Sequence, residues 1–155
     1  MQLEIGSKAP NFSLLNQDSQ LVSLDSFRGQ NSVLLYFYPK AMTPGCTTQA
    51  CGIRDSIDQF ERNGAKVLAV SPDTPDKLKK FVDKEALNFI LLSDSDHAVA
   101  ESYGAWGLKK FMGKEYMGIL RYTYLIDING RIKHIMKNVK TKTHHKDSLQ
   151  LILDD

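Results

Sequence analysis

The amino-acid sequence predicts an α/β fold in which helices cover a mixed sheet, and two observations carry that prediction. Short apolar segments of strand length alternate with stretches of helical periodicity, which is typical of layered α/β proteins. Later in the chain, Asn129-Gly130 separates two further apolar segments and predicts a β-hairpin, which adds antiparallel pairing. A length of 155 residues suits one domain, and 42% apolar with 25% charged residues is a globular composition. We therefore expect a single domain over residues 1–155.

Five apolar segments are expected to form strands. Residues 33–38 are a continuous β-branched and aromatic run that Pro39 ends, and a run that is apolar on both faces predicts a central strand covered on both sides. The other expected strands are residues 67–70, 89–92, 122–126 and 132–135, of which the last two form the hairpin.

Helical patterns lie between these strands. The longest begins after Pro44-Gly45 and ends at Asn63-Gly64, with one apolar stripe at helical spacing. The stripe consists of Ala50, Ile53, Ile57 and Phe60. A second helix opens with Thr74 as its cap and Pro75 at its first position.

Two shorter helices and a loop complete the expected order. The helices cover about residues 96–103 and 143–153, and the second turns Leu149, Ile152 and Leu153 inward. Residues 104–120 carry four of the ten glycines and show no clear period, so we expect an ordered loop there.

Composition and charge exclude several classes of function. Twenty basic and eighteen acidic residues leave a net charge of +2, which argues against nucleic-acid or anionic-membrane binding. No apolar run approaches membrane-spanning length, and the N-terminus has no secretory pattern, so we expect a cytoplasmic protein. Two cysteines exclude a disulfide scaffold and a four-cysteine zinc site. In a reducing compartment they are expected to be free, redox-active or metal-bound.

The cysteines follow the predicted central strand directly. Pro44 and Gly45 suit a turn into a helix, which places Cys46 in the first helical turn. Unpaired backbone N–H groups and the positive end of the helix dipole favour a thiolate there. Cys46 falls on the apolar stripe and so faces inward at the mouth of the fold, and the Thr43 hydroxyl can point to the same spot. This pattern suits a nucleophile in a shallow pocket.

Cys51 lies five residues after Cys46. In an ideal helix this spacing gives a rotation of roughly 140° and a Cα separation of about 8.6 Å. A disulfide needs Cα atoms within about 7 Å. The two cysteines therefore cannot bond while the helix is intact, and a reaction between them requires the first turns to unwind.

These residues resemble an active-site motif. Pro39, Thr43 and Cys46 match the Pro-xxx-Thr/Ser-xx-Cys motif of peroxiredoxins. The stretch from Cys46 to Cys51 resembles the bacterioferritin comigratory protein, or peroxiredoxin Q, subfamily, in which a resolving cysteine lies five residues on. Further segments look like that subfamily in matching order over nearly the whole chain: residues 12–14, 36–40, 91–94, 103–107 and 121–127.

The resemblance implies a fold, an activity and its partners. The fold would be thioredoxin-like, a mixed central sheet flanked by helices with an N-terminal β extension. The activity would be reduction of hydrogen peroxide and organic hydroperoxides to water or alcohol, with thioredoxin or a related dithiol regenerating the enzyme. No metal or organic cofactor is implied. We expect a monomer, because no long apolar edge is evident.

It also implies roles for individual residues. Cys46 would be the peroxidatic nucleophile, and its sulfenic acid would condense with the resolving Cys51. Thr43 would hydrogen-bond the peroxide and the thiolate, Arg121 would lower the pKa of the thiol and orient the substrate, and Pro39 would shield the sulfur from water. Gln49 stands where many peroxiredoxins outside this subfamily carry Glu, so the hydrogen bonds of that Glu are not carried over.

Other interpretations are weighed against this one. A disulfide oxidoreductase of the same fold predicts reduction of protein disulfides without peroxide consumption, but its cysteines would be spaced Cys-x2-Cys. A binding module without redox chemistry would use residues 104–120 and an ordinary thiol at Cys46. A metal-binding module lacks ligands: His144 and His145 are adjacent, project to different sides of a helix, and are interpreted as a solvated pair.

Overall fold

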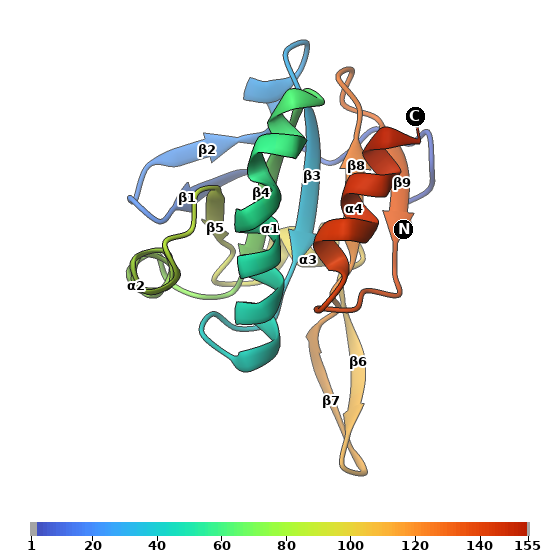
Figure 1. Cartoon of the computed structure of the whole chain (residues 1–155). Coiled ribbons are helices and arrows are strands. Elements are labelled where there is room, and N and C mark those ends of the chain that lie inside the picture. The colour runs from blue at the N-terminus through green and yellow to red at the C-terminus, as the bar shows by residue number, and fades with distance from the viewer. Residues whose placement is uncertain (1–2, 155) are drawn as a thin grey trace.

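The computed structural model describes residues 3–154, and over this range a seven-stranded sheet separates two helical layers (Figure 1). The sheet strands are β1 (Ser13–Asn16), β2 (Leu21–Ser23), β3 (Ser32–Phe37), β4 (Ala65–Ser71), β5 (Ile90–Ser93), β8 (Thr123–Ile126) and β9 (Ile132–Met136). The helices are η1 (Leu24–Phe27), α1 (Pro44–Arg62), α2 (Pro75–Glu85), α3 (Ala98–Ser102) and α4 (His144–Leu153). A separate hairpin consists of β6 (Trp106–Phe111) and β7 (Lys114–Ile119).

The sheet is mixed, with the order β2-β1-β5-β4-β3-β8-β9. Its centre is parallel, because β4 pairs in parallel with β3 and β5, whereas β8 and β9 and the N-terminal β1 and β2 pair antiparallel. The predicted strands and the late hairpin are confirmed to within two residues.

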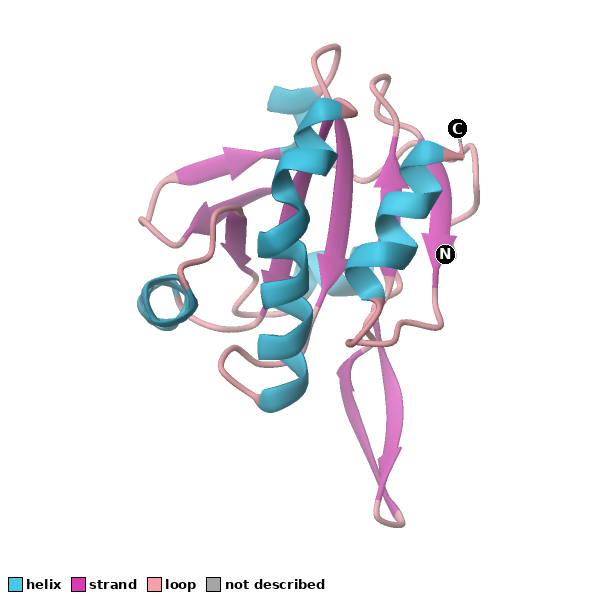
Figure 2. Cartoon of the chain, viewed as in Figure 1, coloured by secondary structure: helices cyan, strands magenta, loops and turns pink. Residues whose placement is uncertain are grey.

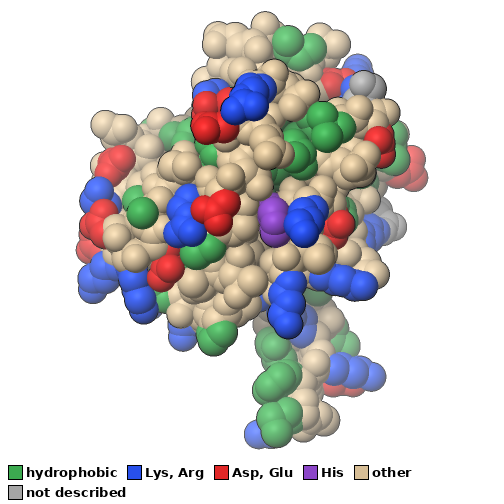
Figure 3. Space-filling view, in the orientation of Figure 1, with side chains coloured by type: hydrophobic (Ala, Val, Ile, Leu, Met, Phe, Trp, Pro, Cys, Tyr) green, Lys and Arg blue, Asp and Glu red, His purple; other side chains and the backbone are tan. Residues whose placement is uncertain are grey.

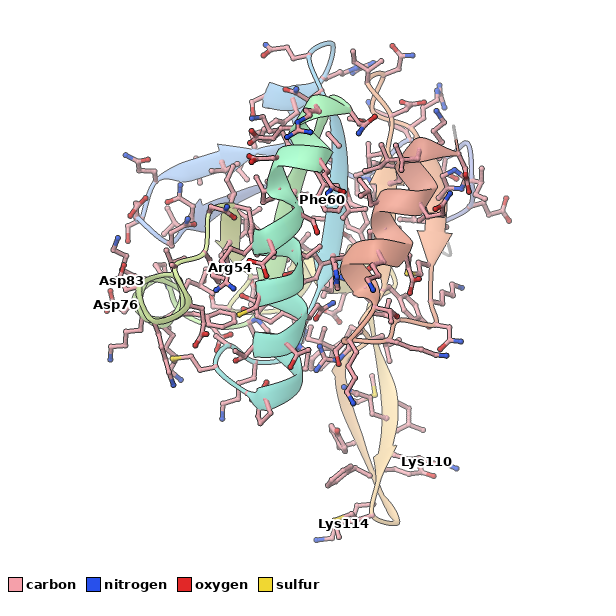
Figure 4. All side chains as sticks on the ribbon, in the orientation of Figure 1. Arg54, Phe60, Asp76, Asp83, Lys110 and Lys114 are labelled. Carbon is pink, nitrogen blue, oxygen red and sulfur yellow. The ribbon has the colours of Figure 1, made fainter. Side chains whose placement is uncertain are left out.

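Both faces of the central strands are buried. Side chains of β3 alternate between the two faces, so that Leu34 and Tyr36 contact one layer and Leu35 and Phe37 the other. On the first face, α1, α2 and α4 cover a core that includes Ile53, Phe60 and Phe81, and Phe60 points from α1 toward the sheet (Figure 4). The other face packs against α3 and the segments around it. The continuous apolar character of residues 33–38 follows from this double burial.

The ends of α1 and α2 follow from local sequence. Thr43 is the N-cap of α1 with Pro44 in its first turn, and Gly64, at a φ of +75°, lies just past its C-terminus. The Thr74 hydroxyl accepts a hydrogen bond from the Lys77 amide, which confirms the predicted cap of α2.

Two expectations were wrong. Residues 104–120 are largely a β-ribbon, not a loop, and the ribbon projects beyond the body of the molecule (Figure 2). Its turn places Met112 and Gly113 at positive φ. Leu153 does not face inward, because 54% of it is exposed, although Leu149 and Ile152 do pack on the core. Within residues 3–154, no helix is long and apolar enough to cross a membrane.

Candidate active site

The site lies where β3 passes into α1. The intervening turn is anchored to the segment that follows β4, because the Ala41 amide donates to the Asp73 carboxylate over 2.7 Å. The Ser71 hydroxyl donates to the same oxygen, also over 2.7 Å. Within the turn the Thr43 hydroxyl donates to the Lys40 carbonyl over 2.9 Å, and Met42 adopts a φ of +67°. The chain therefore enters α1 along a fixed path.

Cys46 occupies the first turn of α1 and is 1% exposed, facing the core as the apolar stripe predicts. The Thr43 side chain makes no capping hydrogen bond. The first backbone N–H groups of α1 therefore receive no acceptor from Thr43 at the end of the helix that carries Cys46. The helix dipole and these groups together favour negative charge at the sulfur.

Arg121 reaches this sulfur from the segment between β7 and β8. Its Nη2 donates to Cys46 Sγ over 3.3 Å, and its Nη1 donates to Gln49 Oε1 over 2.9 Å. The guanidinium lies close to the start of α1, because its Nη2 is 3.4 Å from the position that a Cβ at Gly45 would take. One planar group thus binds two positions on the same face of α1.

Behind Arg121 lies a buried polar cluster that the sequence interpretation missed. Gln49 Nε2 lies 3.1 Å from Nδ1 of His144, and Nε2 of His144 lies 2.8 Å from the Thr123 hydroxyl. His144 is 0% exposed, so the prediction of a solvated histidine pair was wrong for it, while His145 is half-buried. Gln49 accepts a hydrogen bond from Arg121, although the family resemblance assigned no such role to Gln49.

Cys51 has a different environment, on the side of α1 that faces α2. Its thiol donates to the Glu85 carboxylate over 3.6 Å, and Arg54 donates to the Glu85 carbonyl over 2.6 Å; Figure 4 shows Arg54 directed to this side. Burial raises the pKa of the Cys51 thiol, an effect that Arg54 opposes and the Glu85 carboxylate reinforces. Both cysteines are free and α1 is continuous between them.

Pro39 and Lys109 border the site. Pro39 is half-buried just before the turn, and Lys109 of β6 donates to the Ile119 carbonyl over 2.8 Å. Burial lowers the pKa of Lys109, Arg121 lowers it further, and Cys46 opposes the shift. Among the described residues, no three His, Cys, Asp or Glu side chains gather as metal ligands.

A buried cysteine at a helix start, with an arginine donating to its sulfur, defines a thiol-based redox protein. The chain belongs to the AhpC/TSA family, whose model matches residues 5–135. It is 55% identical over 143 residues to peroxiredoxin Bcp of Escherichia coli K12, covering 92% of this chain and 91% of that protein. It is 47% identical over 154 residues to peroxiredoxin Bcp of Bacillus subtilis, covering 99% and 98%.

Solved structures agree with this assignment. The bacterioferritin comigratory protein of Xanthomonas campestris, studied for its alkyl peroxide reduction activity, superposes with a TM-score of 0.89 at 29% identity, covering 98% of this chain and 96% of that one. A cysteine-to-serine variant of PrxQ from Xylella fastidiosa gives 0.92 at 29% identity, covering 99% and 98%. The fold is thioredoxin-like, and the chain is a peroxiredoxin, a thiol-dependent peroxidase.

Proposed function

We propose that this peroxidase reduces hydrogen peroxide and organic hydroperoxides through Cys46, with Cys51 as the resolving thiol. The contact between Arg121 and Cys46 Sγ at the start of α1 carries the proposal. A guanidinium and a helix N-terminus both stabilise a thiolate, and the thiolate is the nucleophile.

In the first step Cys46 attacks one oxygen of the O–O bond. The S–O bond forms as the O–O bond breaks, giving Cys46 sulfenic acid and, after the leaving oxygen takes a proton, water or an alcohol. Thr43 already donates its proton to Lys40, so its oxygen lone pairs are left to accept the O–H of a hydroperoxide. Arg121 orients the substrate, and the half-buried Pro39 keeps water from the sulfur.

In the second step the Cys51 thiol displaces hydroxide from the sulfenic acid, forming a disulfide and water. The two cysteines are five residues apart on a continuous helix, so the first turns of α1 must unwind for the sulfurs to meet. Thioredoxin or a similar dithiol then reduces the disulfide by exchange. We place this cycle in the cytoplasm, in one domain spanning the chain, without a cofactor and in a monomer.

Intact mass and thiol counting test the proposal on reduced protein treated with one equivalent of hydrogen peroxide. We expect a loss of two hydrogens, both thiols consumed and no dimer. Cys51→Ser should gain one oxygen on Cys46 instead, and Cys46→Ser should not react. A gain of one oxygen in the unmutated protein with Cys51 still free would exclude Cys51 as the resolving thiol. No reaction at all would refute the peroxide substrate.

A further inference from the structure

A continuous series of side-chain hydrogen bonds leads from the sulfur of Cys46 to the first residue of α4. Arg121 donates to Cys46 and to Gln49, Gln49 meets His144, and His144 meets Thr123. The distances from the sulfur inward are 3.3, 2.9, 3.1 and 2.8 Å. Every side chain behind Arg121 in this series is at most 1% exposed.

The chemistry of arginine fixes the direction of each bond. A guanidinium only donates, so Gln49 must present its carbonyl oxygen to Arg121. The amide nitrogen of Gln49 then faces His144 Nδ1, which must accept. The imidazole proton therefore resides on Nε2, where it is donated to the Thr123 hydroxyl. The series is consistent only with neutral His144 in one tautomer.

The surroundings of His144 maintain the neutral form. The Tyr36 ring packs edge-on against the imidazole at 4.9 Å between centroids. Burial lowers the pKa of His144 to about 4; Asp147 opposes this shift, and His145 and Arg121 add to it. Both ring nitrogens have buried partners, so removing the imidazole would leave the Gln49 amide and the Thr123 hydroxyl without this bond.

We infer that His144 is a positioning residue for the peroxidase reaction: as a hydrogen-bond acceptor it orients the Gln49 amide, which holds Arg121 against Cys46 Sγ. If Nδ1 did not accept, the Gln49 amide could rotate and present its N–H2 group to the guanidinium. Two donors would then face each other, and Arg121 would lose one of its two anchors on α1. This inference rests on the proposed role of Cys46.

Three variants separate positioning from packing. His144→Asn retains an acceptor close to where Nδ1 stands, His144→Leu removes it at similar volume, and His145→Asn changes the neighbouring histidine, which no described bond joins to the series. The readouts are the pH profile of Cys46 alkylation in a Cys51→Ser background and the second-order rate of its oxidation by hydrogen peroxide. Thermal unfolding verifies that each variant is folded at the assay temperature.

We expect His144→Leu to shift the alkylation profile to higher pH and to lower the oxidation rate by about ten-fold or more, because misplacement of a positioned group is costly. His144→Asn should recover most of the rate, and His145→Asn should match the parent. Folded His144→Leu with the parental profile and rate, or an equal loss in His144→Leu and His144→Asn, would overturn the inference.

A second measurement remains decisive if His144→Leu does not fold. Nitrogen-15 NMR of the parent protein should show His144 neutral at pH 7 with its proton on Nε2, and a proton on Nδ1 would contradict the bond directions. The alkylation profile uses no peroxide, so it tests the positioning role even if the parent protein fails to consume hydrogen peroxide, which would refute the proposed substrate alone.

Discussion

Gly52 of α1 lies against the imidazole of His145 of α4 so closely that a methyl group at Gly52 would overlap the ring. The contact is at the crossing of the two helices, one turn beyond Gln49 and beside His144. The Nδ1 atom of His145 is buried and has no hydrogen-bond partner among the described residues. Glycine at this position therefore determines how closely α4 approaches the helix that carries both cysteines.

Gly52→Ala is expected to lower the stability of the protein. In an unobstructed helix the same change would be favourable by roughly 1 kcal/mol, but overpacking of a tight contact costs about 1–3 kcal/mol. Urea unfolding should show a lower midpoint for Gly52→Ala. In a His145→Ala background, which removes the ring, Gly52→Ala should become neutral or stabilising. If Gly52→Ala stabilised the parent protein instead, the contact with His145 would not limit how closely α1 and α4 pack.

Arg121→Lys should lower the rate of Cys46 oxidation on the order of 100-fold, as loss of a directed donor commonly does. Lysine keeps the charge, but a single ammonium cannot replace the fork that binds both Cys46 and Gln49. We also expect the pH profile of Cys46 alkylation to move to higher pH. Arg131→Lys is the matched control, since Arg131 donates to the Gly6 carbonyl far from the sulfur; a parental rate in Arg121→Lys would refute the role of the fork.

Asp73→Ala should slow peroxide reduction by about ten-fold, since small misplacements near reacting atoms are costly. The substitution leaves the buried Ala41 amide without its acceptor and frees the turn that leads to Cys46. Asp73→Asn retains one carbonyl oxygen and should recover part of the rate. Asp127→Ala removes a carboxylate that also accepts two hydrogen bonds, here from the Asn129 and Arg131 amides at the β8–β9 turn. Asp127→Ala should reduce stability without slowing the oxidation of Cys46 by peroxide, measured by stopped flow. If Asp73→Ala and Asp127→Ala slowed this reaction equally, a specific role for Asp73 would be excluded.

Stability should decline with acid in a window set by His144. Its pKa is about 4 in the folded protein, below the value of 6.5 expected in the unfolded chain, so the unfolded state takes up the proton first. The neutral imidazole of His144 contributes about 3 kcal/mol to the free energy of unfolding. This contribution is complete above pH 6.5 and is lost as the pH falls toward 4. Chemical unfolding of the parent and of His144→Asn across this range isolates the effect as the difference between two curves. Parallel curves would show that the pKa of His144 is the same in the folded and unfolded states.

The central sheet and α1 were predictable because their apolar patterns match their burial. The inward face of α4 was not, because two of its buried positions, His144 and Ser148, are polar. The spacing of apolar residues alone therefore does not identify the buried face of α4, and it placed Leu153 inward although Leu153 is exposed. The signal that was available is the i, i+4 spacing of His144 and Ser148 with Ile152, which defines one side of a helix.

The β6–β7 ribbon was missed for another reason. Its strands are not half-buried, so they carry no inward and outward alternation of apolar residues. Its turn places Met112 at positive φ, where Asn or Gly would have given a recognisable signal. At the candidate site, local spacing and family resemblance pointed to Cys46 and Arg121, which the structure brings into contact. Gln49, His144 and Thr123 meet only through the tertiary packing of three separate elements.

The ribbon also bears on how concentrated solutions of this protein behave. Over the described residues its two strands pair only with each other, and apolar side chains lie exposed along it (Figure 3): Leu108, Phe111, Met112 and Met117. Unpaired strand edges of this kind invite edge-to-edge pairing between copies. Charged side chains oppose such pairing: Lys110 and Lys114 extend from the ribbon into solvent (Figure 4), and Lys110 lies 3.6 Å from the Glu115 carboxylate. Because salt screens these surface charges, we expect copies of the chain to associate more readily through the ribbon at high ionic strength.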